Sequence, residues 1–161
     1  MLNGQIVFSI VTCSDTRDMC SDTAGAALEQ LIAAEGWMCE SRVVVKDDCE
    51  SIAVAISEAC ARDGVDVVLT CGGSGLSLCD VTPEATRAVC DREAPGIAEA
   101  MRAHSLQKTP FAALSRATAM QKGRVLVINL PGSEKAAREN WEVLPVLVAH
   151  AVKMMAGEQH G

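Results

Sequence analysis

Two kinds of apolar pattern alternate along the chain. Short runs that are apolar at nearly every position are separated by longer stretches in which apolar residues recur every three or four positions. The first kind is typical of a buried β-strand and the second of an amphipathic helix. Strands are therefore expected over residues 5–12, 41–46, 65–70 and 124–130.

Helix-capping residues indicate where the first helices begin. Asp22 and Asp48 each precede a helical stretch and are suited to accept a hydrogen bond from its first turn, and a glycine closes each stretch. The pair Thr82-Pro83 predicts a third helix, with Thr82 as its N-cap and Pro83 in the first helical position. Each of these helices follows one of the expected strands.

The second half of the chain is less regular. Residues 96–106 are expected to form a helix, whereas the segment 107–123 is expected to be irregular or partly helical. Ser133 is suited to cap a helix that begins near Glu134. Pro145 then either kinks this helix or begins a second one.

The alternation of strands and helices predicts an α/β fold class, with a mostly parallel sheet covered by helices on both faces. A chain of 161 residues that is 49% apolar suits a single domain, 1–161, and no repeat or linker divides it. Ligands of such sheets bind beyond the carboxyl ends of the strands. Four polar loops are expected there: TCSDTRD, KDD, CGGSGLSLCD and PGS.

Composition and charge narrow the possible partners. Aromatic residues make up 2% of the chain and the net charge is -7, so neither base stacking nor phosphate-backbone binding is favoured and no nucleic-acid partner is expected. The N-terminus lacks a signal-peptide pattern, and no apolar run approaches the roughly 20 residues of a membrane span. We therefore expect no membrane association and a cytoplasmic location.

The chain contains 8 Cys and 3 His. No C-x-x-C pair is present, which disfavours a zinc site, and without a secretory signal the thiols are expected to be reduced. Cys13, Cys71 and Cys79 fall near predicted strand ends, but the missing C-x-x-C pattern also disfavours a redox or metal role for them.

The glycine-rich loop after the third strand is the main candidate for a binding site. Gly72, Gly73 and Gly75 allow a sharp turn that brings backbone N–H groups close to an anion. Neither the G-K-[ST] of a P-loop nor the G-x-G-x-x-G of a dinucleotide site is present. Taken alone, these glycines indicate only a tight turn between a strand and a helix.

Acidic residues near this loop add a second kind of chemistry. Asp80 has two possible roles, an Asx-type turn before the helix or a ligand of Mg²⁺ that bridges to phosphate oxygens. Glu84 suits the first turn of a helix, where an acid is favourable. Asp47 and Asp48 follow the second strand and are expected at the same edge of the sheet.

Several segments resemble the molybdopterin adenylyltransferase family, the MoaB and Mog type of molybdenum cofactor biosynthesis protein. These segments are SDTAGAALEQLI, VVKDD, GGSGLSLCDVTPEAT, TPFAALSRA and VINLPGSEKAARENWEVLPVLVAHAV, in the family's order and at similar spacing. The resemblance covers nearly the whole chain. It implies the molybdopterin-binding-like fold, which is a three-layer α/β/α sandwich, and a homotrimer.

The resemblance also implies a reaction. Members of the family transfer AMP from ATP, as co-substrate, to the terminal phosphate of molybdopterin with Mg²⁺ as cofactor, and they release pyrophosphate. The adenylylated product is passed on, with hand-over to a molybdenum-insertion enzyme as the implied next step.

Site residues follow from the same resemblance. Asp80 and Asp47 match the catalytic aspartates and are implied to hold the metal. The positions matching substrate-binding segments are Ser14, Asp15, Asp22, Gly72, Gly73, Ser74, Gly75, Glu84, Ser115, Arg116, Pro131, Gly132 and Ser133. Simpler roles remain open for some of them: Arg116 is equally suited to a surface ion pair, and Asp22 and Ser133 to helix caps.

Departures from the family pattern define an alternative function. Leu78 and Cys79 stand where the family commonly has a basic residue, so one positive charge beside the phosphates is missing. Ser74 replaces a threonine but keeps the hydroxyl, and Met120 replaces a glycine. A non-catalytic molybdopterin-binding or carrier protein is therefore the alternative to a nucleotidyltransferase, and retention of both Asp47 and Asp80 favours the enzyme.

Overall fold

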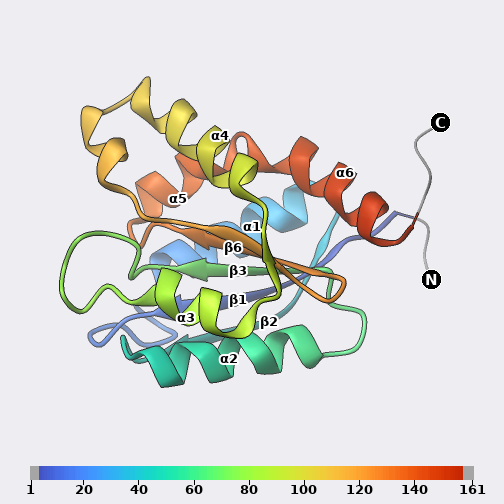
Figure 1. Cartoon of the computed structure of the whole chain (residues 1–161), viewed down its shortest axis with the longest axis horizontal. Coiled ribbons are helices and arrows are strands. Elements are labelled where there is room, and N and C mark those ends of the chain that lie inside the picture. The colour runs from blue at the N-terminus through green and yellow to red at the C-terminus, as the bar shows by residue number, and fades with distance from the viewer. Residues whose placement is uncertain (1–3, 158–161) are drawn as a thin grey trace.

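The computed structural model describes residues 4–157. Its centre is a six-stranded sheet with the strand order β2-β1-β3-β6-β5-β4 (Figure 1). The four strands β2, β1, β3 and β6 are parallel, and β5 and β4 extend this sheet in antiparallel fashion. The strands are β1 (Val7–Cys13), β2 (Met38–Val45), β3 (Val67–Cys71), β4 (Arg92–Glu93), β5 (Ala119–Lys122) and β6 (Val125–Leu130).

Helices cover both faces of the sheet (Figure 1). One face carries α2 and α3 and the other carries α1, α4, α5 and α6, and a separate apolar cluster lies beneath each set. This arrangement confirms the predicted α/β class and its three layers. The helices are α1 (Thr23–Ala34), α2 (Cys49–Ala61), α3 (Thr82–Val89), α4 (Pro95–Leu106), the 3-10 helix η1 (Pro110–Leu114), α5 (Glu134–Trp141) and α6 (Leu144–Met155).

The expected parallel strands are all present, and the segment 107–123 is where the prediction was incomplete. This segment contains the short helix η1 but also strand β5, which pairs with β6 through a hairpin around Gly123. Gly123 has a φ of 57°, a conformation that glycine adopts without strain. Four residues of mixed polarity give too short an alternation to identify a strand.

Two predicted helix boundaries are resolved by the structure. Pro145 lies at the start of a second helix and does not kink the first, because α5 ends at Trp141 and a separate helix α6 begins at Leu144. The prediction for Thr82 was wrong. Helix α3 begins at Thr82 itself, Val81 occupies the cap position, and no side chain caps the helix. The Thr-Pro pair locates the start of the helix but does not fix the direction of the hydroxyl.

Aromatic packing is concentrated at the amino end of the parallel strands. Phe8, near the start of β1, stacks on Trp37 with ring centroids 5.6 Å apart and lies 5.9 Å from Trp141. These rings join the sheet to the α1 and α5 side of the molecule. The carboxyl ends of the same strands lead into the polar loops at the opposite edge of the sheet.

Within residues 4–157, none of the helices has both the length and the apolar character needed to cross a membrane.

Candidate active site

The candidate site lies where the parallel strands end. The chain leaves β1 toward β2 on one side and returns to β3 on the other, so β1 and β3 form the topological switch point at which such sheets bind ligands. Backbone hydrogen bonds join neighbouring loops there. Ser14 N–H donates to Val45 O at 2.9 Å, and Gly72 N–H donates to Leu130 O at 2.9 Å.

The loop after β3 presents free backbone donors. Gly72 and Gly73 have φ values of 96° and 68°, and this pair of left-handed residues turns the chain directly after the strand. Within residues 4–157, the N–H groups of Gly73, Ser74 and Gly75 have no protein acceptor. Successive unpaired N–H groups in such a turn form a concave anion-binding nest.

Arg116 holds this loop in place. Its Nε donates to Gly75 O at 2.8 Å and its Nη2 to Asp80 O at 2.7 Å, while its backbone N–H donates to Ser74 O at 2.8 Å. Nη1 forms an ion pair with Glu84, and this contact holds the pKa of the Glu84 carboxyl below its usual range. The Arg116 guanidinium is therefore paired with groups of the protein itself. This is the ion-pair role that the sequence left open as an alternative to substrate binding.

Asp80 closes the same loop. Its Oδ2 accepts the N–H of Ser77 at 3.1 Å, while its own N–H donates to Ser77 O at 2.9 Å. The local turn predicted for Asp80 is thus present. Asp80 also lines a cavity beside this loop, so a structural and a binding role are compatible at this position.

Asp47 and Asp15 hold each other across the loops after β2 and β1. Asp15 N–H donates to Asp47 Oδ2 at 3.2 Å, and Asp47 N–H donates to Asp15 Oδ1 at 3.0 Å. The other oxygen, Asp47 Oδ1, is buried and has no partner among the described residues. Burial, followed by the charges of Asp15 and Asp80, raises the pKa of Asp47. Asp47 is thus a carboxylate in a setting that would favour a nearby cation.

A cavity of about 480 Å³ opens beside the glycine loop. Its walls are this loop, the loop after β6, helix α5, the C-terminal half of α4, and η1. The volume falls in the range of small-molecule sites, roughly 300–1,000 Å³. The predicted residues that line it are Gly72, Gly73, Ser74, Gly75, Asp80, Ser115, Pro131 and Gly132.

Other predicted residues lie around the cavity without lining it. They are Ser14, Asp15, Asp22, Asp47, Glu84, Arg116 and Ser133. Ser14 Oγ accepts from the N–H groups of Thr16 and Arg17 and so shapes the loop after β1. Ser133 caps α5 by accepting from Ala136 N–H at 3.2 Å. Their contacts within the protein explain both serines without a ligand.

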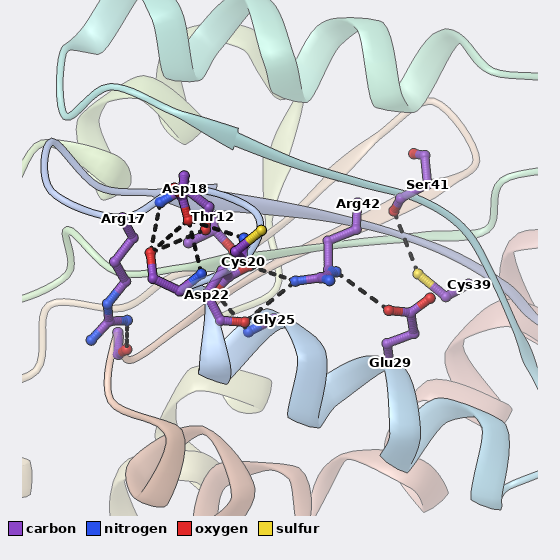
Figure 2. Close-up of polar contacts among 12 residues, drawn as sticks. Thr12, Arg17, Asp18, Cys20, Asp22, Gly25, Glu29, Cys39, Ser41 and Arg42 are labelled. Atoms are coloured by element: carbon purple, nitrogen blue, oxygen red, sulfur yellow. Dashed lines mark hydrogen bonds and ion pairs between the residues drawn. The ribbon is translucent and has the colours of Figure 1, made fainter.

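Asp22 has a structural role (Figure 2). It is buried, it caps α1 by accepting from Gly25 N–H at 3.0 Å, and it accepts from Thr12 Oγ1 at 2.8 Å. Arg42 completes the set with an ion pair of 3.1 Å. All of these partners belong to the protein, so Asp22 fixes α1 against β1 and β2 rather than facing the cavity.

Sequence reasoning missed the far wall of the cavity and one cross-loop contact. Arg17 Nη1 donates to Gly132 O at 2.5 Å and so joins the loops after β1 and β6. The far wall carries Arg102, Ser105, Thr109, Phe111 and Asn140. Arg102 and Ser105 share one face of α4 at a spacing of three residues, which is the signal that was available in the sequence.

The two buried cysteines near the strand ends, Cys13 and Cys71, are not activated nucleophiles. All eight cysteines are free thiols, and Cys13 and Cys71 are buried. Burial raises the pKa of the Cys13 thiol to about 12 and shifts that of Cys71 upward as well. Because the thiolate is the reactive form, these two side chains behave as small apolar residues of the core.

The residues present fit a cation that arrives with a phosphate ligand. Within residues 4–157, no three His, Cys, Asp or Glu side chains gather into a metal-binding cluster. Asp47 Oδ1 is nevertheless a buried oxygen without a partner, and the charge of Asp80 is near enough to raise the Asp47 pKa. Mg²⁺ is commonly bound by one or two carboxylates together with substrate phosphates. Two carboxylates beside an anion-binding nest match that pattern.

The fold and site define an α/β protein with an anion-binding site at its strand ends. A family model described as a probable molybdopterin binding domain matches residues 6–150, and the chain therefore belongs to this family. The resemblance seen in the sequence is thereby confirmed.

Named relatives agree with this assignment. The chain is 42% identical over 142 residues to molybdenum cofactor biosynthesis protein B of Bacillus cereus, covering 86% of this chain and 84% of the relative. It is 39% identical over 114 residues to the molybdopterin adenylyltransferase of Helicobacter pylori strain J99, covering 71% of this chain and 65% of the relative. It also matches 26% of the longer molybdenum cofactor synthesis protein cinnamon of Drosophila melanogaster, with 35% identity over 95% of this chain.

Solved structures share the fold over nearly the full length. The crystal structure of a molybdenum cofactor biosynthesis protein B superposes with a TM-score of 0.90 and 36% identity, covering 96% of this chain and 98% of that chain. The overall fold of this chain is therefore shared with a solved protein of this type.

Replacing Asp47 by asparagine is expected to stabilise the folded chain at neutral pH. A carboxyl whose pKa is raised on folding binds protons more tightly when folded, so it costs stability above its folded pKa and the cost disappears at lower pH. Asp47→Asn should therefore raise the melting temperature at pH 7, and this gain should vanish as the pH falls through the ordinary Asp pKa of about 4. Thermal melts between pH 3 and 8 measure it.

Asp48→Asn is the matched control, with the opposite sign. Asp48 caps α2, and its contacts with Ser51 lower the Asp48 pKa, so its ionised form stabilises the fold above about pH 4. Asp48→Asn should leave the melting temperature at pH 7 unchanged or lower it. A loss of stability in Asp47→Asn at pH 7 would contradict the account of Asp47 as a carboxyl whose ionised form costs stability.

Proposed function

We propose that this chain transfers AMP from ATP to the terminal phosphate of molybdopterin and releases pyrophosphate. The observation that carries the proposal is the nest of free N–H groups at Gly73, Ser74 and Gly75 beside Asp47 and Asp80. Family membership and the Helicobacter pylori adenylyltransferase support the same reaction.

Phosphate binding is assigned to the glycine loop. The three N–H groups of residues 73–75 provide neutral donors, and Arg116 fixes the loop so that these donors need not reorganise when an anion binds. A chain with a net charge of -7 needs such local donors to hold anionic reactants. The N–H groups of the loop therefore offset the repulsion between the negatively charged protein and its anionic reactants.

Asp47 and Asp80 are proposed to hold Mg²⁺ together with the triphosphate. Mg²⁺ bound there would neutralise phosphate charge and reduce the repulsion between the two anionic reactants. The task of the chain is to hold both carboxylates in place beside the phosphates. The reciprocal hydrogen bonds of Asp47 with Asp15 and the turn contact of Asp80 with Ser77 serve that purpose.

The reaction exchanges one phosphoanhydride bond for another. An oxygen of the molybdopterin phosphate forms a bond to the α-phosphorus of ATP, and the bond from that phosphorus to the oxygen bridging to the β-phosphate breaks. The electron pair of the broken bond leaves with pyrophosphate. The phosphate nucleophile is already ionised at neutral pH, so positioning and charge neutralisation are the main contributions of the protein.

The cavity beyond the loop is proposed to hold molybdopterin. It combines apolar surface from Phe111 and Leu114 with polar groups of Ser115 and Asn140 and the nearby cation of Arg102. Arg102 donates to Ala117 O at 2.7 Å, which keeps its charge at the cavity wall. A flat heterocycle with polar edges and an anionic tail matches this lining.

Further partners belong to the same proposal. We expect a homotrimer, hand-over of the adenylylated product to a molybdenum-insertion enzyme, and a cytoplasmic location. The single-domain organisation over residues 1–161 also stays a prediction, and the family match to residues 6–150 is compatible with it.

Asp80→Asn is expected to lower kcat by about 10²-fold or more, because the variant loses the charge of the carboxylate. Molybdopterin binding should change by less than about threefold, because the amide oxygen keeps the contact with Ser77. Pyrophosphate release from Mg-ATP and molybdopterin measures turnover, and fluorescence titration with molybdopterin measures binding. Asp63→Asn, an exposed change in the turn between α2 and β3, is the matched control and should keep full activity.

A specific observation favours the carrier alternative. Leu78 is 98% exposed at the tip of the loop, and neither it nor Cys79 supplies the positive charge expected beside a triphosphate. Molybdopterin binding by the wild-type chain without any pyrophosphate release would support the carrier and contradict the enzyme. Equal loss of binding and turnover in Asp80→Asn would contradict the metal role of Asp80.

Leu78→Arg is expected to lower the KM for ATP about three- to tenfold, because one exposed positive charge at the loop tip attracts the triphosphate. The effect should shrink with rising ionic strength. Leu78→Gln is the control for loss of the apolar side chain without a charge. A KM for ATP that is unchanged by arginine and insensitive to salt would show that the tip does not approach the triphosphate.

A further inference from the structure

The hydroxyl of Thr82 is a buried polar group without a partner. Thr82 is 0% exposed, and its Oγ1 has no hydrogen-bond partner among the described residues. Buried hydroxyls are nearly always hydrogen-bonded, because an unpaired one has lost its contacts with water without replacing them. A buried hydroxyl without a hydrogen bond therefore needs a physical explanation.

Within residues 4–157, this hydroxyl forms no hydrogen bond that would give it a structural role. It does not cap α3, because the helix begins at Thr82 and no side chain caps it. The Cys13 thiol lies nearby: burial raises the Cys13 pKa and the Thr82 hydroxyl partly offsets this, but the contact does not have hydrogen-bond geometry, and the thiol donates to Val11 O at 3.9 Å. One turn later, Thr86 is equally buried and fully engaged, since it donates to Thr82 O at 2.8 Å and accepts from Asn129 at 2.9 Å.

The hydroxyl is directed at the glycine loop. A Cβ atom added to Gly73 would lie 2.2 Å from Thr82 Oγ1 and 3.4 Å from Asp47 Oδ1. The two unpaired buried oxygens are therefore neighbours on the same side of Gly73. Any side chain at residue 73 would occupy this position and separate them.

Two neighbouring unpaired oxygens, one of them a carboxylate, form an oxygen-only setting of the kind that hard cations prefer. Within residues 4–157, acidic, His and Cys side chains alone do not make up a metal-binding group, so a divalent cation held by Asp47 and Asp80 lacks a third protein ligand of those types. A threonine or serine hydroxyl supplies such a ligand in phosphate-binding loops of other folds.

We propose that Thr82 Oγ1 is a third protein ligand of the divalent cation, beside Asp47 and Asp80. The proposal rests on the proposed function, because the cation is the one that accompanies ATP. It explains why the hydroxyl is unpaired in the protein alone, why a glycine is needed at residue 73, and why Thr82 does not serve as the helix cap.

The test uses Mn²⁺-ATP as a paramagnetic probe of the whole chain. Thr82→Val removes the hydroxyl and keeps the shape. Electron paramagnetic resonance should show Mn²⁺-ATP affinity reduced about tenfold or more. In ¹⁷O-labelled water, the bound Mn²⁺ should gain one water in place of the lost ligand. Thr82→Ser restores the hydroxyl and should bind within about threefold of wild type. If the valine variant does not fold, Thr82→Ala takes its place.

Thr86→Val is the matched control, and stability separates the two sites. Thr82→Val removes an unpaired hydroxyl, so its melting temperature should equal or exceed that of wild type. Thr86→Val removes a hydroxyl that is hydrogen-bonded, so its melting temperature should fall by about 2–4 °C or more while Mn²⁺-ATP affinity stays within about twofold.

The outcomes separate the two proposals. In one outcome the wild-type chain binds Mn²⁺-ATP, and Thr82→Val changes neither the affinity nor the number of waters on Mn²⁺. This outcome overturns the role of Thr82 and leaves the proposed function standing. Wild-type chain that binds no Mn²⁺-ATP overturns both. Weaker binding in Thr82→Val with a melting temperature below that of wild type would mark Thr82 as structural and also overturn the proposal.

Discussion

The site depends on the close approach of three backbone segments at the carboxyl ends of β1, β3 and β6. A Cβ atom at Gly72 would lie 2.6 Å from Cys13 O, and one at Gly132 would lie 3.2 Å from the Cα of Gly72. Real Cβ atoms essentially never come as close to backbone as the contact at Gly72, so that position requires glycine, and a side chain at Gly132 would fit only if the Gly72 backbone moved by a few tenths of an ångström. The approach turns the chain after β3 directly into the loop that lines the cavity and whose N–H groups at residues 73–75 have no acceptor within residues 4–157.

The polar groups around this contact are of two kinds. Some hold the loops in place, and others have no partner within residues 4–157 and are available to a ligand. Arg116 and Glu84 use their charges on each other and on the loop backbone. Asp47 Oδ1 and Thr82 Oγ1, by contrast, stay buried and unpaired. Groups of the first kind stabilise the fold, whereas those of the second kind cost stability until a ligand arrives. Functional sites commonly combine the two.

Local patterns predicted the elements that depend on local chemistry. The parallel strands, and the caps at Asp22 and Asp48, follow from apolar runs and from side chains that reach their own helix. The far wall of the cavity at Phe111 was missed because it is built by α4 and η1, which only the tertiary fold brings to the glycine loop. Thr82 was wrongly predicted as a cap because the Thr-Pro pair does not fix the direction of the hydroxyl. The engagement of Arg116 with the glycine loop was missed because it depends on residues more than thirty positions away.

The central claim is that the loops after β2 and β3 hold a divalent cation beside the phosphates of ATP. Anomalous scattering from crystals of the chain grown with Mn²⁺ and a non-hydrolysable ATP analogue tests it directly. The account predicts one strong manganese peak within coordinating distance of both Asp47 and Asp80, next to nucleotide phosphate density at residues 73–75. Ordered nucleotide at the glycine loop with manganese elsewhere, or with no manganese at all, would contradict it.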